Sequence, residues 1–243
     1  TRKLTLTSAG TSYLDKCRTI LDLVEVAEAD VMEARLTPRG NLRIGLPLSY
    51  GLKRVAPLLP AFQKNFPEIS LALDFTDRHI NLIDEGIDLS IRITPRLDAG
   101  DVARKLGESR LIAVASPDYL AQHGRPAHPS ELSAHICLGY SAKANNRPLA
   151  FMIDGTMQNV HVPFRLQANN GDALTEAAAQ GLGITVQPDF IVDDYLARGV
   201  VVPVLEAFEA PPLGIHAVLP SNRYLPHRVR VLIDFLAAEL GRS

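Results

Sequence analysis

The sequence predicts an α/β protein of two lobes, with one long helix in front of them. Hydrophobic residues make up 47% of the 243 residues, which is enough to bury one or two cores without disulfides or metal. Residues 8–36 contain no proline and no glycine after Gly10, and their apolar residues recur at heptad spacing. The rest of the chain alternates segments of strand period with segments of helix period, which is typical of α/β proteins.

The predicted first helix, from about residue 8 to residue 36, would be roughly 40 Å long at 1.5 Å per residue. Its apolar or small residues alternate between spacings of four and three: Tyr13, Cys17, Ile20, Val24, Ala27, Val31 and Ala34. Such a narrow stripe needs a partner to bury it. We expect the same helix of a second subunit, and packing on the chain's own domain is the alternative. Thr37 and Pro38 end the helix.

The first lobe begins with strands predicted at residues 42–46, 69–75, 87–93, 102–106 and 111–115. A helical pattern runs from Leu52 to Phe66, and Pro57 and Pro60 should kink or restart it. Asp77 is expected to cap a short helix that ends at Gly86. This alternation predicts a largely parallel sheet with helices on both faces.

The second lobe is predicted to open with a helix that Ser116 caps, Pro117 begins and Gly124 ends. Another short helix should open at His128. Strands are expected at residues 136–140, 149–153, 159–162, 165–168, 183–187 and 200–204, and helices at 171–180 and 189–198.

The last strand and helix, residues 214–219 and 226–240, have the character of the first lobe. The chain should therefore cross between lobes twice, near residues 115–116 and 211–212. Lobe I would hold about 41–115 and 213–243, and lobe II about 116–212. Two lobes joined twice form a cleft, and α/β proteins bind ligands at the carboxyl ends of their strands.

Composition and termini exclude several classes of protein. A formal net charge of −2 gives no general attraction to nucleic acid or to an anionic membrane. The first ten residues lack the apolar core of an export signal, and no apolar run approaches the ~20 residues of a membrane span. Cys17 and Cys137 match no metal or redox spacing. We therefore expect a cytoplasmic protein, and, since the chain opens without methionine inside a basic, Thr-rich stretch, a fragment of a longer one.

The sequence does not match the motifs of the common classes of enzyme. Gly181 and Gly183 follow a predicted helix and precede a strand, the reverse of a dinucleotide-binding loop, and Val186 holds the third glycine position. There is no Walker pattern and no G-x-S-x-G. His123, His128 and His135 lie near Cys137 in the sequence, but the spacing of these four residues fits no zinc site. We therefore predict that the protein is not an enzyme and that it binds no cofactor and no metal ion. A transporter's solute-binding protein is the alternative, although it needs an export signal and no heptad helix.

Several sequence blocks together resemble LysR-type transcriptional regulators. They are RKLTLTSAG at 2–10, PRGNLRI at 38–44, APLLPAF at 56–62, LIDEGIDLSIR at 82–92, ASPDYL at 115–120, NNGDAL at 169–174, GLGI at 181–184 and RYLPHRVR at 223–230. The resemblance spans the whole chain. Residues 1–37 would be a wing remnant and dimerising linker helix, and 38–243 an effector-binding domain.

The resemblance implies two Rossmann-like lobes of the periplasmic-binding-protein type II architecture with two crossovers. It implies a small-molecule effector in the cleft, homodimers or homotetramers, and DNA contact through a helix-turn-helix that would precede Thr1. Two departures stand out. The helix-turn-helix is absent from the sequence, so these residues alone should not read DNA, and residues 141–149 lack a tryptophan that similar sequences often carry.

The predicted effector-binding residues follow strands of both lobes: Leu48, Ser49, Arg92, Ile93, Thr94, Tyr140, Asn169, Asn170, Gly171, Gln187 and Pro188. Hydroxyl, amide and guanidinium donors facing a cleft would suit a small acid or polar metabolite. Several of them have a structural alternative. Ser49 could simply cap a helix, Arg92 could pair with a surface acid, the Asn-Gly run could form a turn, and Tyr140 could pack in the core.

Overall fold

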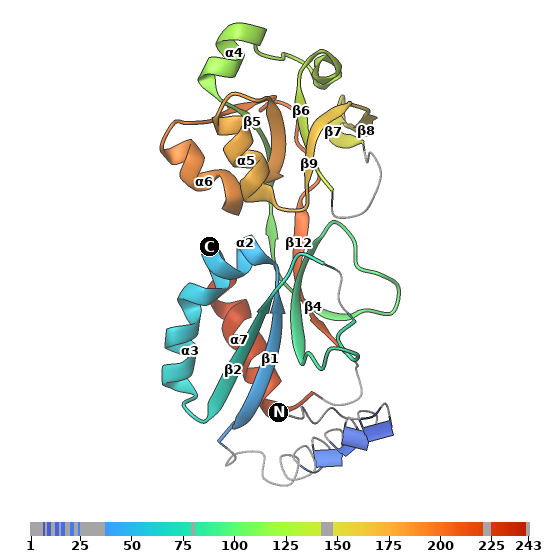
Figure 1. Ribbon diagram of the computed structural model, residues 1–243, viewed down its shortest axis with the longest axis vertical. Helices are drawn as coiled ribbons and strands as arrows, with labels where there is room; N and C mark the ends of the chain where they lie inside the picture. Colours follow the sequence, from blue (N-terminus) through green and yellow to red (C-terminus); the bar gives the residue numbers. More distant parts are fainter. Residues whose placement is uncertain are drawn as a thin grey trace, which may run out of the picture.

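The computed structural model describes residues 7, 9–10, 13–14, 16–17, 20–21, 24, 37–78, 81–141, 148–220 and 225–241. Within these residues the strands form two five-stranded sheets and a two-stranded sheet. Figure 1 shows the two larger sheets stacked along the long axis of the molecule, each with its own helices. The predicted two-lobed α/β architecture is confirmed.

Lobe I is built on the sheet β2-β1-β3-β12-β4. Its strands are β1 (Gly40–Leu46), β2 (Ile69–Phe75), β3 (Leu89–Thr94), β4 (Val102–Ser109) and β12 (Leu213–Leu219). Its helices are α2 (Leu48–Tyr50), a π-helix (Gly51–Val55), a 3-10 turn (Ala56–Leu58), α3 (Leu59–Asn65) and α7 (His227–Leu240). The predicted kink is confirmed, because Pro57 lies in the 3-10 turn and Pro60 in the first turn of α3.

Lobe II is built on the sheet β11-β5-β10-β6-β9. Its strands are β5 (Leu111–Ala115), β6 (Cys137–Tyr140), β9 (Phe164–Ala168), β10 (Ile184–Pro188) and β11 (Val202–Val204), with a hairpin of β7 (Leu149–Ile153) and β8 (Thr156–Val160). Its helices are α4 (Pro117–His123), a 3-10 helix (Pro129–Ala134), α5 (Gly171–Ala179) and α6 (Asp189–Ala197). The Ser116 hydroxyl caps α4 by accepting from the Tyr119 amide, as predicted.

The prediction of largely parallel sheets was wrong. In lobe I, β1 runs parallel to β2 and β3, but β12 runs antiparallel to β3 and β4. In lobe II, β6 runs parallel to β9 and β10, but β5 runs antiparallel to β10 and β11. The reason is that β12 enters its sheet from the other lobe, against the direction of the strands that lead there.

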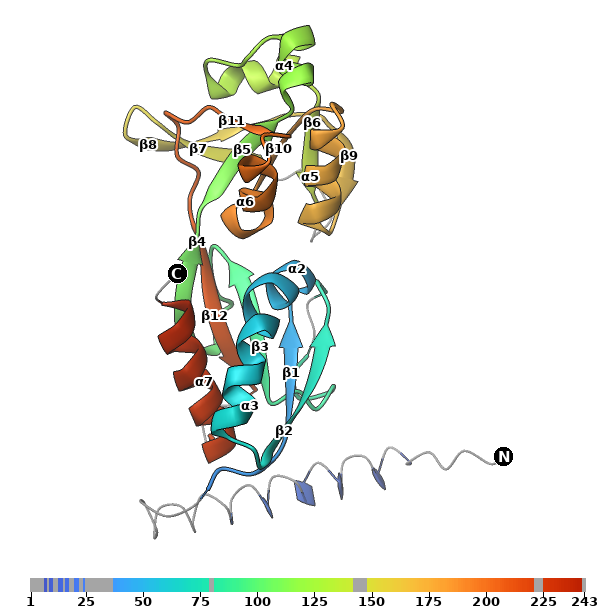
Figure 2. The same ribbon diagram turned by 90° about the vertical axis from the view of Figure 1, so that its left-hand side faces the viewer.

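Among the described residues, helices cover only one face of the lobe I sheet, and not both as predicted. Helices α3 and α7 lie on the same face (Figure 2), where the rings of Phe62 and Phe235 are 5.4 Å apart. On the other face, Leu82 and Ile87 from the segment between β2 and β3 form a small cluster with Val218.

The first crossing between lobes lies at Arg110, ahead of the predicted position near residues 115–116. Strand β5 pairs with β10 and β11 and so belongs to lobe II, and a single residue separates it from β4 of lobe I. The second crossing falls between Val204 and Leu213, a span that contains the predicted residues 211–212.

The predicted short helix between Asp77 and Gly86 was wrong. Residues 82–86 form a turn instead. The Asp77 carboxylate accepts a hydrogen bond from the backbone amide of Leu48 at 3.0 Å, so its capping capacity serves the start of α2. Gly86 ends the turn with φ of 61°, a conformation that glycine adopts without strain.

The largest hydrophobic cluster reaches across both lobes. It holds Ile44, Phe62 and Leu232 from lobe I and also Phe190 and Ile191 from α6 of lobe II, all of them buried. A second cluster, around Tyr119 and Phe151, lies within lobe II. Helix α6 therefore packs against lobe I as well as its own sheet, so apolar contact helps to hold the lobes together.

The described part of the first helix, at residues 9–10, 13–14, 16–17, 20–21 and 24, is helical. Three of its seam residues are exposed in a single chain, with exposed fractions of 71% for Tyr13, 58% for Ile20 and 48% for Val24, and Cys17 is half-buried. At these positions the helix is not buried on its own domain. The predicted seam residues Ala27 and Val31 lie outside the described residues.

We expect a Gly183→Ala substitution to lower the free energy of unfolding by about 1–3 kcal/mol, the usual cost of overpacking. A Cβ at Gly183 would lie 2.3 Å from the carbonyl oxygen of Ile136, which accepts the Ile184 amide at 2.8 Å and joins β10 to β6. Urea denaturation measures the change. Gly107→Ala is the matched control, because its Cβ would meet only Ile215, at 4.0 Å. Equal losses in the two variants would contradict the prediction.

Candidate functional site

Two helix starts from different lobes face each other between the sheets. In lobe I, β1 ends at Leu46 and leads through Pro47 into α2, which carries Ser49. In lobe II, β9 ends at Ala168 and leads into α5, where the Asn170 side chain caps the helix by accepting the Ala173 amide at 3.1 Å. Each helix starts at the carboxyl end of a strand, where α/β proteins place ligands.

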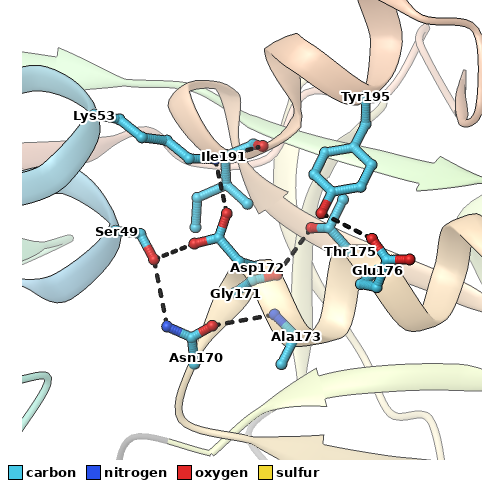
Figure 3. Close-up of polar contacts among 10 residues, drawn as sticks. All are labelled: Ser49, Lys53, Asn170, Gly171, Asp172, Ala173, Thr175, Glu176, Ile191 and Tyr195. Carbon is cyan, nitrogen blue, oxygen red and sulfur yellow. Dashed lines mark hydrogen bonds and ion pairs between the residues drawn. The ribbon is translucent and has the colours of Figure 1, made fainter.

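Four side chains connect these helix starts, and we call them the interlobe cluster: Ser49, Lys53, Asn170 and Asp172 (Figure 3). The Ser49 hydroxyl donates to Oδ2 of Asp172. The Lys53 ammonium pairs with Oδ1 of Asp172 at 2.7 Å. The Asn170 amide donates to Oγ of Ser49 at 3.4 Å. The two lobes are therefore joined by direct polar contacts at the predicted position.

Further contacts continue the interface along α6. Nζ of Lys53 donates to the carbonyl oxygen of Ile191 at 3.3 Å, and Arg54 pairs with Asp193 at 2.9 Å. The rings of Tyr50 and Phe190 meet edge to face, with centroids 5.0 Å apart. Burial raises the pKa of the Tyr50 phenol to about 12, so the phenol stays neutral within this apolar part of the interface.

The π-helix explains how two consecutive cations reach across to the same lobe. A π-helix has more residues in each turn than an α-helix, so the angle between successive side chains is smaller. Lys53 and Arg54 can therefore both point toward lobe II. Gly51 allows this segment to lie close to the sheet, because a Cβ there would come within 2.8 Å of the Phe75 ring and 2.9 Å of Leu46. π-Helical turns occur frequently at functional sites.

Several predicted site residues come together here. Ser49 and Asn170 belong to the interlobe cluster, and Gly171 is buried beside it, where a Cβ would lie 2.4 Å from Ile191. Leu48 is 40% exposed next to Ser49, and its amide is held by Asp77. Asn169 is exposed just ahead of the cap residue.

The residues at the end of β3 have partners within lobe I. Arg92 pairs with Asp101 at 3.2 Å, and each of these side chains is 18% exposed. Ile93 packs against the large cluster. The Thr94 hydroxyl donates to the carbonyl oxygen of Arg96 at 2.7 Å. The structure gives these three side chains local structural contacts and does not bring them into the interlobe cluster.

The remaining predicted residues are Tyr140, Gln187 and Pro188 at the strand ends of lobe II. Tyr140 is 48% exposed, and desolvation together with the Asp77 carboxylate raises the pKa of its phenol to about 12, so it remains a neutral donor. Gln187 is 1% exposed, and its amide donates to Thr185 at 2.8 Å. Pro188 is half-buried, ends β10 and is the N-cap residue of α6. Gln187 therefore lies behind Gly171 and is not presented to the interface.

Sequence reasoning missed both charged members of the cluster. Asp172 stands inside the block NNGDAL, and Lys53 inside the helical pattern that follows β1. Each reads locally as an ordinary charge on a helix. One signal was available in the sequence. Lys53 and Asp172 each follow the end of a strand, and these two strand ends were expected to face each other across the cleft. Only the arrangement of the lobes shows that the two side chains pair.

Among the described residues, metal-ligating groups and the thiol of Cys137 are the features that bear on metal binding and thiol chemistry. They contain no group of three or more His, Cys, Asp or Glu side chains placed to hold a metal ion. Burial raises the pKa of the Cys137 thiol to about 11, which keeps it protonated and unreactive. None of the helices that the structure describes has the length and apolar character that crossing a membrane requires.

Comparison with known proteins is consistent across sequence and structure. The family described as LysR substrate binding domain matches residues 36–241. The HTH-type transcriptional regulator CrgA of Neisseria meningitidis serogroup C is 33% identical over 244 residues, covering 100% of this chain and 81% of that protein. The regulator DmlR of Escherichia coli K12 is 32% identical over 239 residues, covering 97% and 77%.

Solved structures show the same likeness. The structure of CrgA from Neisseria meningitidis, a LysR-type transcriptional regulator, superposes with a TM-score of 0.75 at 32% identity, covering 99% of this chain and 82% of that one. The full-length structure of the Vibrio cholerae virulence activator AphB gives a TM-score of 0.72 at 28% identity, covering 98% and 81%.

Proposed function

This chain belongs to the family of LysR-type transcriptional regulators, and from that premise we propose that its lobes bind a small polar or acidic metabolite between them. The observation that carries the proposal is the interlobe cluster, where Ser49 and Lys53 of lobe I meet Asn170 and Asp172 of lobe II. Membership of this family favours a regulator over the solute-binding protein of a transport system.

The donors of the cluster support a ligand with oxygen acceptors. Ser49 supplies a hydroxyl, Asn170 an amide and Lys53 a positive charge, and they come from both lobes. We assign direct ligand contact to these side chains and to their neighbours Leu48, Asn169, Gly171 and Tyr140. Supporting roles fall to the predicted residues that already have local partners or lie behind the cluster: Arg92, Ile93, Thr94, Gln187 and Pro188.

The signal would pass through the arrangement of the lobes or of the subunits. A ligand shifts an equilibrium only by the difference in its affinity for the two states, and ligands that touch both lobes have such a difference between open and closed forms. The proposal includes homodimers or homotetramers, paired through the first helix. It includes DNA contact through a helix-turn-helix outside these 243 residues, a cytoplasmic location, and no enzymatic activity.

We expect Ser49→Ala to weaken the binding of a metabolite found by thermal-shift screening by roughly 10-fold to 100-fold. A hydrogen bond to a charged group contributes about 1.5–3 kcal/mol, and the screen works because a ligand that binds the folded state raises the melting temperature. Isothermal titration measures the affinity. Ser70→Ala, an exposed serine at the start of β2, is the control. A metabolite that binds both variants like the wild type would place its site elsewhere, and a screen of acidic and polar metabolites without a binder would count against the function.

A further inference from the structure

We propose that the Asp172 carboxylate is an internal substitute for the carboxylate of an acidic ligand. It occupies the anion-binding position formed by Ser49, Lys53 and Asn170, joins the two lobes while it does so, and is displaced when a ligand carboxylate takes its place. This inference rests on the proposed ligand-binding function and adds to it the chemical class of the ligand and a residue that determines specificity.

Both oxygens of Asp172 are held by donors of the other lobe. Oδ2 accepts the Ser49 hydroxyl, and Oδ1 pairs with the Lys53 ammonium at 2.7 Å. A hydroxyl and an ammonium side by side are the donors that would bind the two oxygens of any carboxylate. The anion-binding position is therefore defined by the Ser49 and Lys53 donors. Asp172 fills this position because it lies in the first turn of α5, which begins beside these donors.

Asn170 fixes the direction of the Ser49 hydroxyl. Its amide nitrogen donates to Oγ of Ser49 at 3.4 Å, while its own oxygen accepts the Ala173 amide. Since Oγ of Ser49 accepts on that side, its single proton is available for the carboxylate. A free carboxylate in place of Asp172 would find the same donor already oriented.

The exposure of the ion pair allows exchange. The side chains of Lys53 and Asp172 are 27% and 34% exposed, so a small ion can reach them without unfolding the protein. Partly exposed ion pairs contribute little net free energy, because water solvates the separated charges well. Displaced Asp172 would remain in contact with solvent, so it would not become a buried, unpaired charge.

Tethering makes Asp172 a strong competitor all the same. A group attached near its binding position acts at an effective concentration in the millimolar range or above. A simple free carboxylate should therefore fail to displace it, and a natural ligand needs additional contacts. The anion position should be open to simple carboxylates only when the tethered one is removed.

Acetate tests this directly, because it is the aspartate side chain cut free from the backbone. In Asp172→Ala, sodium acetate at up to about 100 mM should raise the melting temperature by roughly 3 °C or more and with saturation, relative to sodium chloride at equal ionic strength. The wild type should show no such rise. Acetamide, which has the same shape and no charge, should give none in either protein.

Three variants define the position. Asp193→Ala removes a second interlobe ion pair, that of Arg54, and should not respond to acetate. Adding Lys53→Ala to Asp172→Ala should abolish the response. If Asp172→Ala does not fold, the isosteric Asp172→Asn serves. Its neutral amide competes less well for Lys53 than the carboxylate does, so acetate should still raise the melting temperature, but by a smaller amount.

Equal responses of the wild type and the Asp172 variants to acetate, a response of the variants to acetamide, or no response to acetate would overturn the inference. The result of this experiment can be distinguished from the result of the test of the proposed function. A metabolite whose binding depends on Ser49, found while acetate has no effect, leaves the function standing and removes the internal substitute. Acetate rescue without any metabolite binder leaves the anion position standing and removes the proposed metabolite-binding function.

Discussion

Replacing Phe190 with alanine should lower the free energy of unfolding by about 3–5 kcal/mol, the range for truncating a buried aromatic side chain. Phe190 is 6% exposed and belongs to the cluster that spans both lobes, and its ring meets Tyr50 of lobe I edge to face. The substitution removes buried apolar area and leaves a cavity where lobe I packs against α6. We expect both stability and lobe closure to suffer.

Urea denaturation measures the loss of stability, and small-angle X-ray scattering measures the separation of the lobes. Phe208→Ala is the matched control. Phe208 is partly buried against the lobe II cluster, where its ring meets His128 at 5.0 Å, away from the interface. It should cost less and leave the radius of gyration unchanged. The interface assignment fails if the two variants show the same stability loss and the same radius of gyration.

An Ile20→Glu substitution should dissociate the dimer that we propose, with the dimer dissociation constant rising at least 100-fold. Ile20 belongs to the predicted heptad seam and is 58% exposed in one chain. Burying an isoleucine contributes about 1.5–3 kcal/mol, the change occurs in both copies, and each 1.4 kcal/mol corresponds to a factor of ten. Two introduced carboxylates facing each other add repulsion.

Light scattering over a range of concentrations measures this change. The control is Lys16→Glu, which alters charge at an exposed position of the same helix that lies off the seam. It should leave most of the dimer intact. A wild-type protein that is monomeric at high concentration would contradict the pairing, and equal dissociation of the two variants would contradict the seam.

Elements with local signals could be predicted well from the sequence. The helix that begins at Pro117 has its cap, its proline and its terminating glycine within a few residues, and the structure uses all three. Such contacts join near neighbours in the chain, so no knowledge of the fold is needed to find them. Asp77 had the same local appearance, but its carboxylate serves Leu48, 29 positions away, and no helix follows it among the described residues.

Strand direction and the first crossing depended on pairing between distant segments. Residues 111–115 read as a strand in either lobe, because hydrophobic alternation reports burial and not the identity of the neighbouring strand. Pairing with β10 and β11 places them in lobe II. In the same way, β12 is antiparallel to β3 and β4 because the chain returns to lobe I from lobe II.

By itself, the sequence determined the two-lobed α/β architecture and the placing of Ser49 and Asn170 where helices follow strands. Those features depend on periodicity and on short-range hydrogen bonds, which neighbouring residues encode. The tertiary structure alone decided that Lys53 and Asp172 meet and that Phe190 packs on Tyr50. Each of these contacts joins residues of different lobes, and it exists only because the closed lobes bring two distant surfaces within bonding distance.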